Sequence, residues 1–172
     1  CIWYIRRQFK FRPLDTRIAQ NKHNAVTEEI FLRYAQITGW GKYAPPLLMT
    51  NDDMAKIVDT SDEWIFSRSG IRQRHYSHIS TGEMGWLAAE QALAAAGVDA
   101  DDIDLVILGS TTPEEMCPNT ASYIKNKLGA ATAAAFDLNS ACTSWFYGLN
   151  VASDMIAAGS INKALVVGSE RI

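Results

Sequence analysis

The sequence lacks the features of a membrane-spanning, secreted or disordered protein. In its 172 residues, no uncharged apolar stretch approaches the roughly 20 residues that a spanning helix needs. Its three cysteines, an odd number, do not suit a disulfide framework and are typical of a reducing cytosol. A hydrophobic fraction of 48% excludes disorder. We therefore expect a globular protein of the cytoplasm with no membrane partner.

Common phosphate-binding and metal-binding motifs are also missing. Neither a Walker loop nor a Gly-x-Gly-x-x-Gly occurs. Two histidines and two arginines lie between positions 72 and 78, but no cysteine or carboxylate completes a zinc set, which favours a solvated basic loop. Glu114 and Glu115 are interpreted as a polar surface turn and not as an acid/base pair. We expect no metal and no resident cofactor.

Charge divides the chain near position 36. Residues 1–36 carry seven basic and three acidic side chains, whereas residues 37–172 carry nine and sixteen. Aromatic and basic residues mix near the start, as in single-strand nucleic-acid or membrane-surface contacts. However, no methionine precedes Met49, which favours a segment upstream of the true start or a vector-derived one. We interpret residues 1–36 as a basic leader of doubtful origin without a function, and the acidic remainder disfavours nucleic-acid binding.

From residue 37 onward, caps and glycines separate alternating strands and helices. Strands are expected at residues 37–41, 104–110, 133–138 and 164–167, and helices at residues 51–58, between Ser61 and Gly70, and at residues 82–96, 119–128 and 143–158. The first of these helices is expected to have Asn51 as its N-cap. The unbroken apolar run at 104–110 is typical of a strand that is covered on both faces. The alternation predicts an α/β layered fold with a mostly parallel sheet between helices. The last strand has no closing helix, which favours a piece of a larger gene product.

Cys142 is the candidate nucleophile. It lies where the strand 133–138 gives way to the helix 143–158. A thiol at a helix N-terminus meets unsatisfied N–H groups and the positive end of the helix dipole, which lower its pKa toward the reactive thiolate. The same N–H groups can hold an oxyanion, and the small neighbours Ser140 and Ala141 allow a substrate to approach. Spacing alone is equally compatible with a small buried cysteine. Cys117 lacks this context and is interpreted as a pocket-lining or loop residue.

Three segments together resemble β-ketoacyl-acyl carrier protein synthase III, a condensing enzyme of the thiolase superfamily. They are residues 51–75, 137–149 and 164–170. The resemblance runs from about Ile37 to the end of the chain, and implies that residues 37–172 are the amino-terminal domain of a thiolase-like fold, truncated at the carboxy end. The signature at 59–75 favours this family over hydroxymethylglutaryl-CoA synthase-like and chalcone synthase-like enzymes, which share the nucleophile turn.

The resemblance implies an acyltransferase that initiates fatty acid biosynthesis. Cys142 would accept an acyl group from acyl-CoA and pass it to the carbanion formed when malonyl-acyl carrier protein loses carbon dioxide, giving 3-oxoacyl-acyl carrier protein. Coenzyme A is then part of a substrate. The histidine and asparagine that stabilise the enolate in the family have no counterpart in this chain, so the chain alone is expected to be inactive in condensation. The complete enzyme is expected to be a cytoplasmic homodimer.

The resemblance also assigns Trp64 and Arg68 to coenzyme A, with the indole on the adenine and the guanidinium beside it. Residues four apart lie on one helix face, so this aromatic ring and this cation can contact one nucleotide together. Spacing alone favours a half-buried tryptophan covered by an arginine stem. The surrounding signature favours the coenzyme A site.

Some residues depart from the family pattern. Thr143, Ser144 and Trp145 replace the small and phenylalanine residues that usually follow the nucleophile, which implies an altered acyl pocket. Cys117 aligns near a residue that in the family closes the partner subunit's acyl pocket, so its small side chain would admit a longer or branched primer. Two alternatives follow: a specialised-metabolite ketosynthase of the same superfamily, or a non-catalytic partner subunit. The presence of Cys142 counts against the second.

Overall fold

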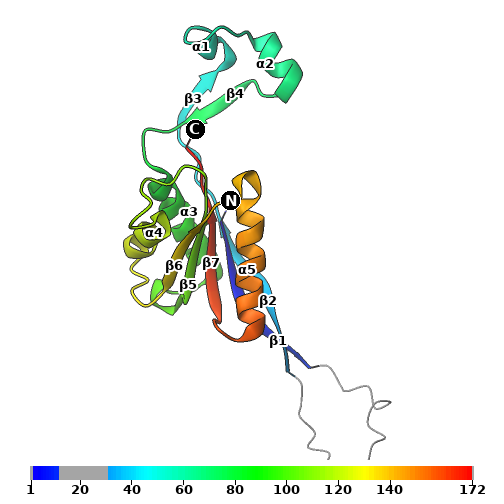
Figure 1. The fold of residues 1–172 in the computed structure, drawn as a ribbon, viewed down its shortest axis with the longest axis vertical. Helices are drawn as coiled ribbons and strands as arrows, with labels where there is room; N and C mark the ends of the chain where they lie inside the picture. The colour runs from blue at the N-terminus through cyan, green and yellow to red at the C-terminus, as the bar shows by residue number, and fades with distance from the viewer. Residues whose placement is uncertain (1, 12–30, 172) are drawn as a thin grey trace, which may run out of the picture.

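The computed structural model describes residues 2–11 and 31–171, which form a β-sheet body and a smaller unit that projects from one end of it (Figure 1). The strands are β1 (Ile2–Phe11), β2 (Phe31–Gly41), β3 (Leu47–Thr50), β4 (Gln73–Tyr76), β5 (Leu105–Gly109), β6 (Ala134–Leu138) and β7 (Lys163–Gly168). The helices are α1 (Asn51–Ala55), α2 (Asp62–Ser69), α3 (Thr81–Ala96), α4 (Thr120–Leu128) and α5 (Ser144–Ala158), with short 3₁₀ turns η2 (Ala100–Asp102) and η3 (Ala141–Thr143).

Five strands form the sheet of the body, in the order β2-β1-β7-β5-β6. β5 runs parallel to β6 and to β7, whereas β1 runs antiparallel to β2 and to β7. The predicted α/β fold with a parallel sheet is therefore confirmed for the strands that carry helical crossovers. The sequence did not predict β1 as a sheet strand, and it predicted β2 to begin at Ile37 and not at Phe31. The boundary predicted between residues 36 and 37 lies inside β2.

Helices cover both faces of this sheet (Figure 1). Val106 and Leu108 of β5 are buried in a cluster with side chains of α3 and α4, while Leu105 and Ile107 are buried in a second cluster with side chains of α5. Successive residues of a strand point to opposite faces, so an apolar run without alternation requires cover on both sides. The prediction made for residues 104–110 is confirmed.

Glycine positions end the helices as predicted. Gly70, Gly97, Gly129 and Gly159 follow α2, α3, α4 and α5, and each has a positive φ. A residue without a Cβ adopts this left-handed conformation at little steric cost, which allows its N–H to bond the last helical carbonyls. The ends of these four helices were therefore readable from the sequence, whereas α1, which was predicted to continue to residue 58, ends at Ala55.

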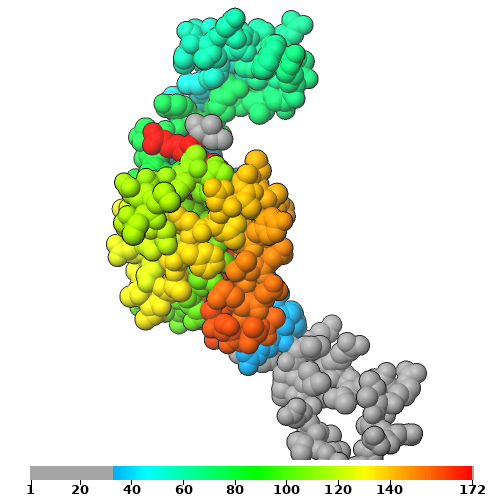
Figure 2. Space-filling view, viewed as in Figure 1, coloured from blue at the N-terminus to red at the C-terminus, as the bar shows by residue number. Residues whose placement is uncertain are grey.

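Residues 47–76, which we call the projecting unit, contain the antiparallel strand pair β3–β4 and, between these strands in the chain, the helices α1 and α2. Figure 2 shows this unit standing clear of the body. The N-cap predicted for α1 was wrong: Thr50 caps the helix, because its side chain accepts from the Asp53 N–H while the Asp53 carboxylate accepts from the Thr50 N–H. The basic loop predicted at 72–78 was also wrong in part, since His75 lies in β4.

Asn51 has a different role, as a buried hydrogen-bonding centre of the projecting unit. Its Nδ2 donates to Asp62 Oδ1 at 2.7 Å and to the Ile71 carbonyl at 2.8 Å, and its Oδ1 accepts from the Arg74 guanidinium at 2.6 Å. One side chain thus joins α1, α2 and β4.

In the part of the chain that the structure describes, no helix is long and apolar enough to cross a membrane.

Candidate active site

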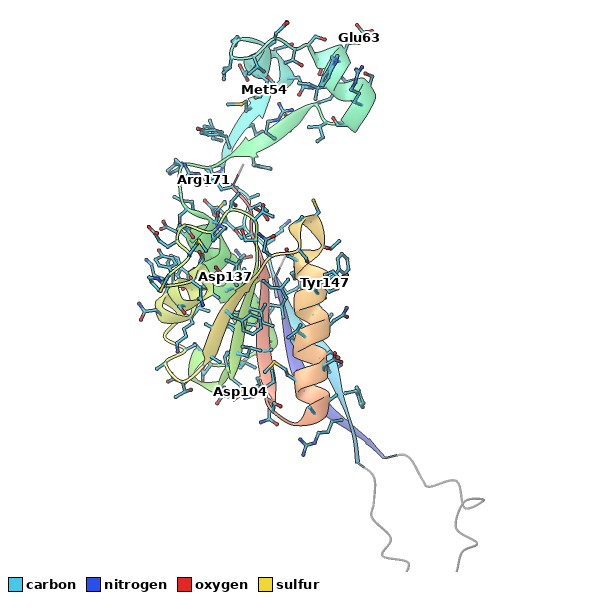
Figure 3. The ribbon with its side chains drawn as sticks, viewed as in Figure 1. Met54, Glu63, Asp104, Asp137, Tyr147 and Arg171 are labelled. Atoms are coloured by element: carbon cyan, nitrogen blue, oxygen red, sulfur yellow. The ribbon has the colours of Figure 1, made fainter. Side chains whose placement is uncertain are left out.

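The candidate nucleophile lies at the edge of the sheet where the three parallel strands end. Gly109 of β5 is level with Leu138 of β6 and with Gly168 of β7. Arg171, which follows β7, lies between the body and the projecting unit, so this edge faces that unit (Figure 3). Cys142 follows β6 within η3, and its thiol is free and exposed. Ligands of open parallel sheets commonly bind outside this edge.

The turn that carries Cys142 has a backbone conformation uncommon for a residue with a side chain. Ala141 has a φ of 52°, in the left-handed region, which costs a residue other than glycine roughly 1–2 kcal/mol. Hydrogen bonds within the turn hold it: the Ala141 N–H donates to Asn139 Oδ1 at 3.2 Å, and Thr143 Oγ1 donates to the Ser140 carbonyl at 2.7 Å. The helix predicted to begin at Thr143 begins one residue later, because η3 precedes it.

The backbone N–H of Cys142 is available to a ligand. Among residues 2–11 and 31–171, no acceptor is found for it, whereas the next two N–H groups donate to the carbonyls of Ser140 and Ala141. A free N–H beside an exposed thiol can donate to an oxyanion that forms on an acyl group attached to that thiol. The arrangement therefore has the chemistry needed for acyl transfer.

Gly109 allows α5 to begin close to the end of β5. A Cβ at this position would lie 2.8 Å from the Trp145 nitrogen and 2.9 Å from Ser144 Cβ. Any side chain would push the first turn of α5, and the nucleophile turn before it, away from the sheet. Sequence reasoning did not identify Gly109 as part of the site, since only the tertiary structure brings β5 against this turn.

Asp137 of β6 anchors the strand that leads into the nucleophile turn. Its Oδ1 accepts from the Ala121 N–H at 2.7 Å and its Oδ2 accepts from the Thr120 N–H at 2.9 Å. A carboxylate is stabilised at a helix N-terminus by the free N–H groups and the helix dipole. Asp137 therefore ties β6 to α4 directly beside the turn. Figure 3 shows that Asp137 and Tyr147 come from different elements near this edge.

Trp64 and Arg68 lie together on α2 of the projecting unit. The guanidinium carbon of Arg68 is 4.4 Å from the centroid of the Trp64 ring, and its Nη1 donates to the Trp64 carbonyl at 3.4 Å. Trp64 is 55% exposed, so the arginine covers only part of its indole. The structure thus provides an exposed aromatic ring paired with a cation, which is suited to a nucleotide base.

A cavity of about 200 Å³ lies where the projecting unit meets the carboxyl-terminal edge of the sheet. Its lining includes His75 of β4, Met84 of α3 and Glu170 beyond β7. The Glu170 carboxylate accepts from the N–H and Oγ1 of Thr111, at 2.7 and 2.9 Å, and from Thr112 Oγ1 at 2.8 Å. These bonds hold the loops after β5 and β7 together beside the cavity.

The loop after β5 carries Glu114 and Cys117. Glu114 is a structural cap, as its Oε1 accepts from the Gly82 N–H at 2.6 Å and its Oε2 accepts from Thr120 Oγ1 at 2.9 Å. Partial burial raises the pKa of Glu114, but hydrogen bonds from Ser80, Gly82 and Thr120 outweigh this effect and lower the pKa below its usual value. Cys117 is an exposed loop residue.

No group of three or more potential metal ligands occurs in the described part of the chain.

Comparison with known proteins shows which family this chain is similar to. A family model described as 3-oxoacyl-[acyl-carrier-protein (ACP)] synthase III matches residues 136–172, which include the nucleophile turn. A β-ketoacyl-[acyl-carrier-protein] synthase III of Vibrio vulnificus is 48% identical over 139 residues, which are 81% of this chain and 38% of that protein. The chain is a homologue of β-ketoacyl-acyl carrier protein synthase III. It spans about 40% of the length of the curated synthase III relatives that it matches.

Solved structures of similar proteins confirm the fold class. The synthase III of Aquifex aeolicus is 38% identical with a TM-score of 0.75, over 78% of this chain and 44% of that one. The priming β-ketosynthase of the R1128 polyketide pathway is 34% identical with a TM-score of 0.78, over 81% of this chain and 42% of that one. The resemblance to synthase III and the thiolase-like α/β fold are thus confirmed, whereas the roles of Cys142, Trp64 and Arg68 stay predictions.

Proposed function

We propose that the complete protein is an acyltransferase that condenses an acyl-CoA primer with malonyl-acyl carrier protein and so initiates fatty acid biosynthesis. The observation that carries this proposal is the exposed Cys142 at the strand-to-helix turn of a synthase III homologue, with its own N–H free to donate. A nucleophile and an oxyanion donor on one residue are what acyl transfer from a thioester requires.

The first half-reaction uses only groups at this turn. The Cys142 thiolate attacks the carbonyl carbon of acyl-CoA, and the carbonyl electron pair moves to oxygen, where the Cys142 N–H stabilises it. When this pair returns, the bond to the coenzyme A sulfur breaks. Coenzyme A leaves as a thiolate that takes a proton from water, and the acyl group remains on Sγ as a thioester.

The second half-reaction forms the carbon–carbon bond. Malonyl-acyl carrier protein loses carbon dioxide, the resulting carbanion attacks the acyl carbon, and Cys142 leaves as a thiolate, which gives 3-oxoacyl-acyl carrier protein. The donors that stabilise the enolate in the family have no counterpart in this chain, so condensation belongs to the complete protein. We place that protein in the cytoplasm as a homodimer, the arrangement expected from its family.

Trp64 and Arg68 are proposed to hold the adenine of coenzyme A. The Trp64 ring is 55% exposed although the Arg68 guanidinium lies 4.4 Å from its centroid. Both residues are on α2, in the unit that the nucleophile edge of the sheet faces. Stacking of a base on an aromatic residue contributes about 1–3 kcal/mol, so Trp64→Ala should weaken coenzyme A binding by about 5- to 150-fold. Ile57→Ala, another exposed apolar residue of the unit, is the matched control and should bind normally.

The proposal is tested by mass spectrometry of the full-length protein after incubation with acetyl-CoA and with longer acyl-CoAs. We expect an increase in mass that equals the acyl group, mapped to the Cys142 peptide and not to Cys117, and absent from Cys142→Ala. If the folded wild-type protein takes no acyl group from any primer, the proposal fails and a non-catalytic partner subunit becomes the better interpretation.

A specialised-metabolite ketosynthase is the second candidate. The similarity to the R1128 priming β-ketosynthase, at a TM-score of 0.78, favours it, as does Trp145 in place of the family's phenylalanine. Its prediction concerns the primer: longer or branched acyl-CoAs should label Cys142 faster than acetyl-CoA. Labelling confined to acetyl-CoA would reject this candidate and leave the first.

A further inference from the structure

Ser144 is a buried polar residue whose hydroxyl donates one hydrogen bond and accepts another. Its side chain is at the first position of α5, and the residue is only 2% exposed. The hydroxyl accepts from the Ser140 N–H at 2.8 Å and donates to the Ala141 carbonyl at 2.7 Å. These two peptide groups lie on either side of the left-handed Ala141, so one hydroxyl spans the strained part of the turn.

These hydrogen bonds do not serve the helix itself. The N-cap position of α5 is Thr143, whose side chain makes no capping bond, and the Ser144 hydroxyl points back into the turn. Ser144 also donates its backbone N–H to the Ala141 carbonyl. The Ala141 carbonyl is therefore held twice by the same residue.

Holding this carbonyl determines where the Cys142 N–H points. The Ala141 carbonyl and the Cys142 N–H belong to one planar trans peptide group, in which the two bonds point in opposite directions. A carbonyl directed at Ser144 therefore turns the Cys142 N–H away from Ser144. This is the N–H that makes no hydrogen bond among the described residues.

We infer that Ser144 is a positioning residue that orients the Cys142 N–H toward the oxyanion of the acyl-transfer step. The inference rests on the proposed function and assigns to Ser144 a role in the rate of acylation and not in the reactivity of the thiol. Gly109 supports it, since a Cβ there would lie 2.9 Å from Ser144 Cβ and would displace the residue.

The test compares two reactions of the same thiol in the full-length protein. Transfer of an acetyl group from acetyl-CoA passes through an oxyanion, whereas alkylation by iodoacetamide requires only an accessible thiolate. In Ser144→Ala, the acylation rate of Cys142 should fall by about 10- to 100-fold, because small misplacements of catalytic groups have effects of that size. The alkylation rate should stay within about threefold of wild type, since the thiol itself is unchanged.

Controls separate the possible outcomes. Ser153→Ala removes another hydroxyl from α5 and should leave both rates unchanged; Ser144→Gly repeats the test should Ser144→Ala not fold. Equal acylation in wild type and in the Ser144 variants would overturn the inference alone. A parallel fall in acylation and alkylation would also overturn it, because it would mean a structural effect on the thiol. No acylation of the wild-type protein would overturn the proposed function instead.

Discussion

The body and the projecting unit are stabilised by different interactions. The body buries apolar side chains on both faces of its sheet, in two clusters. Within residues 47–76, all of which the structure describes, Asn51 is the single buried residue. Many of the unit's large apolar side chains are exposed: Leu47, Leu48, Ile57, Val58, Trp64, Phe66, Ile71 and Tyr76. Polar contacts therefore maintain the unit, and apolar packing maintains the body.

This difference matters for the proposed site, because its two proposed halves lie in different parts of the molecule. The nucleophile turn is attached to the apolar body through β6 and α5, whose side chains cannot shift without opening a cavity. Trp64 and Arg68 are on α2, which is held by its caps, by Asn51 and by the exposed ion pair between Asp62 and Arg72. The packed body is suited to fixing a reacting group, whereas the unit offers exposed apolar and aromatic side chains to a large ligand.

The largest effect is expected in the body. Ile107 on β5 is fully buried against α5, and Ile107→Ala should reduce the free energy of unfolding by about 2–5 kcal/mol because it leaves a cavity. Chemical denaturation of the full-length protein measures this loss. Ile57→Ala, in the projecting unit and exposed, should have almost no effect, and equal losses for the two variants would contradict the comparison.

A smaller and local effect is expected for Asn51→Ala. The change removes one hydrogen bond each from the Asp62 carboxylate, the Ile71 carbonyl and the Arg74 guanidinium, which should destabilise the projecting unit by about 1–3 kcal/mol. Hydrogen exchange should therefore speed up in residues 47–76 and stay slow in β5. Faster exchange throughout the sheet would show that the projecting unit and the body do not open independently of one another.

The pH dependence should distinguish the parts further. The pKa of Glu114 is lowered in the folded body. Its contribution to the free energy of unfolding is therefore complete when the pH is above the ordinary pKa near 4.5, and it is lost as the pH falls through the pKa of the folded protein. Glu114→Gln should lower stability at neutral pH by about 1 kcal/mol and reduce the loss on acidification. Thermal unfolding of the two proteins between neutral and acidic pH tests this, and parallel curves would reject it.

The smallest effect is expected for Arg72→Ala in the projecting unit. Arg72 lies 3.8 Å from the centroid of the Phe66 ring and 2.8 Å from Asp62 Oδ2. Exposed contacts of this kind contribute only about 0.5 kcal/mol and weaken with salt. Hydrogen exchange of α2 should speed up slightly in the variant, and this difference should shrink at high salt. A large, salt-independent effect would mean that Arg72 is a second hydrogen-bonding centre of the projecting unit, as Asn51 is.

Much of the body was predictable because local chemistry and tertiary structure agree there. The apolar run 104–110 could be buried on both faces only between two layers of helices. The glycines that follow the helices of the body are favoured at helix ends because they adopt a positive φ. The projecting unit was less predictable. Thr50 and Asn51 are both good N-caps, and only the hydrogen bonds to Asp62, Ile71 and Arg74 show that Asn51 is used elsewhere.

The sequence by itself determined the α/β class, most element positions, the family resemblance and Cys142 as candidate nucleophile, because these depend on the order of residue types along the chain. The tertiary structure alone decided that Ser144 spans the nucleophile turn, that Gly109 makes room for it and that Asp137 joins β6 to α4. Each of these contacts depends on backbone groups brought together by folding, and backbone groups are the same in every sequence.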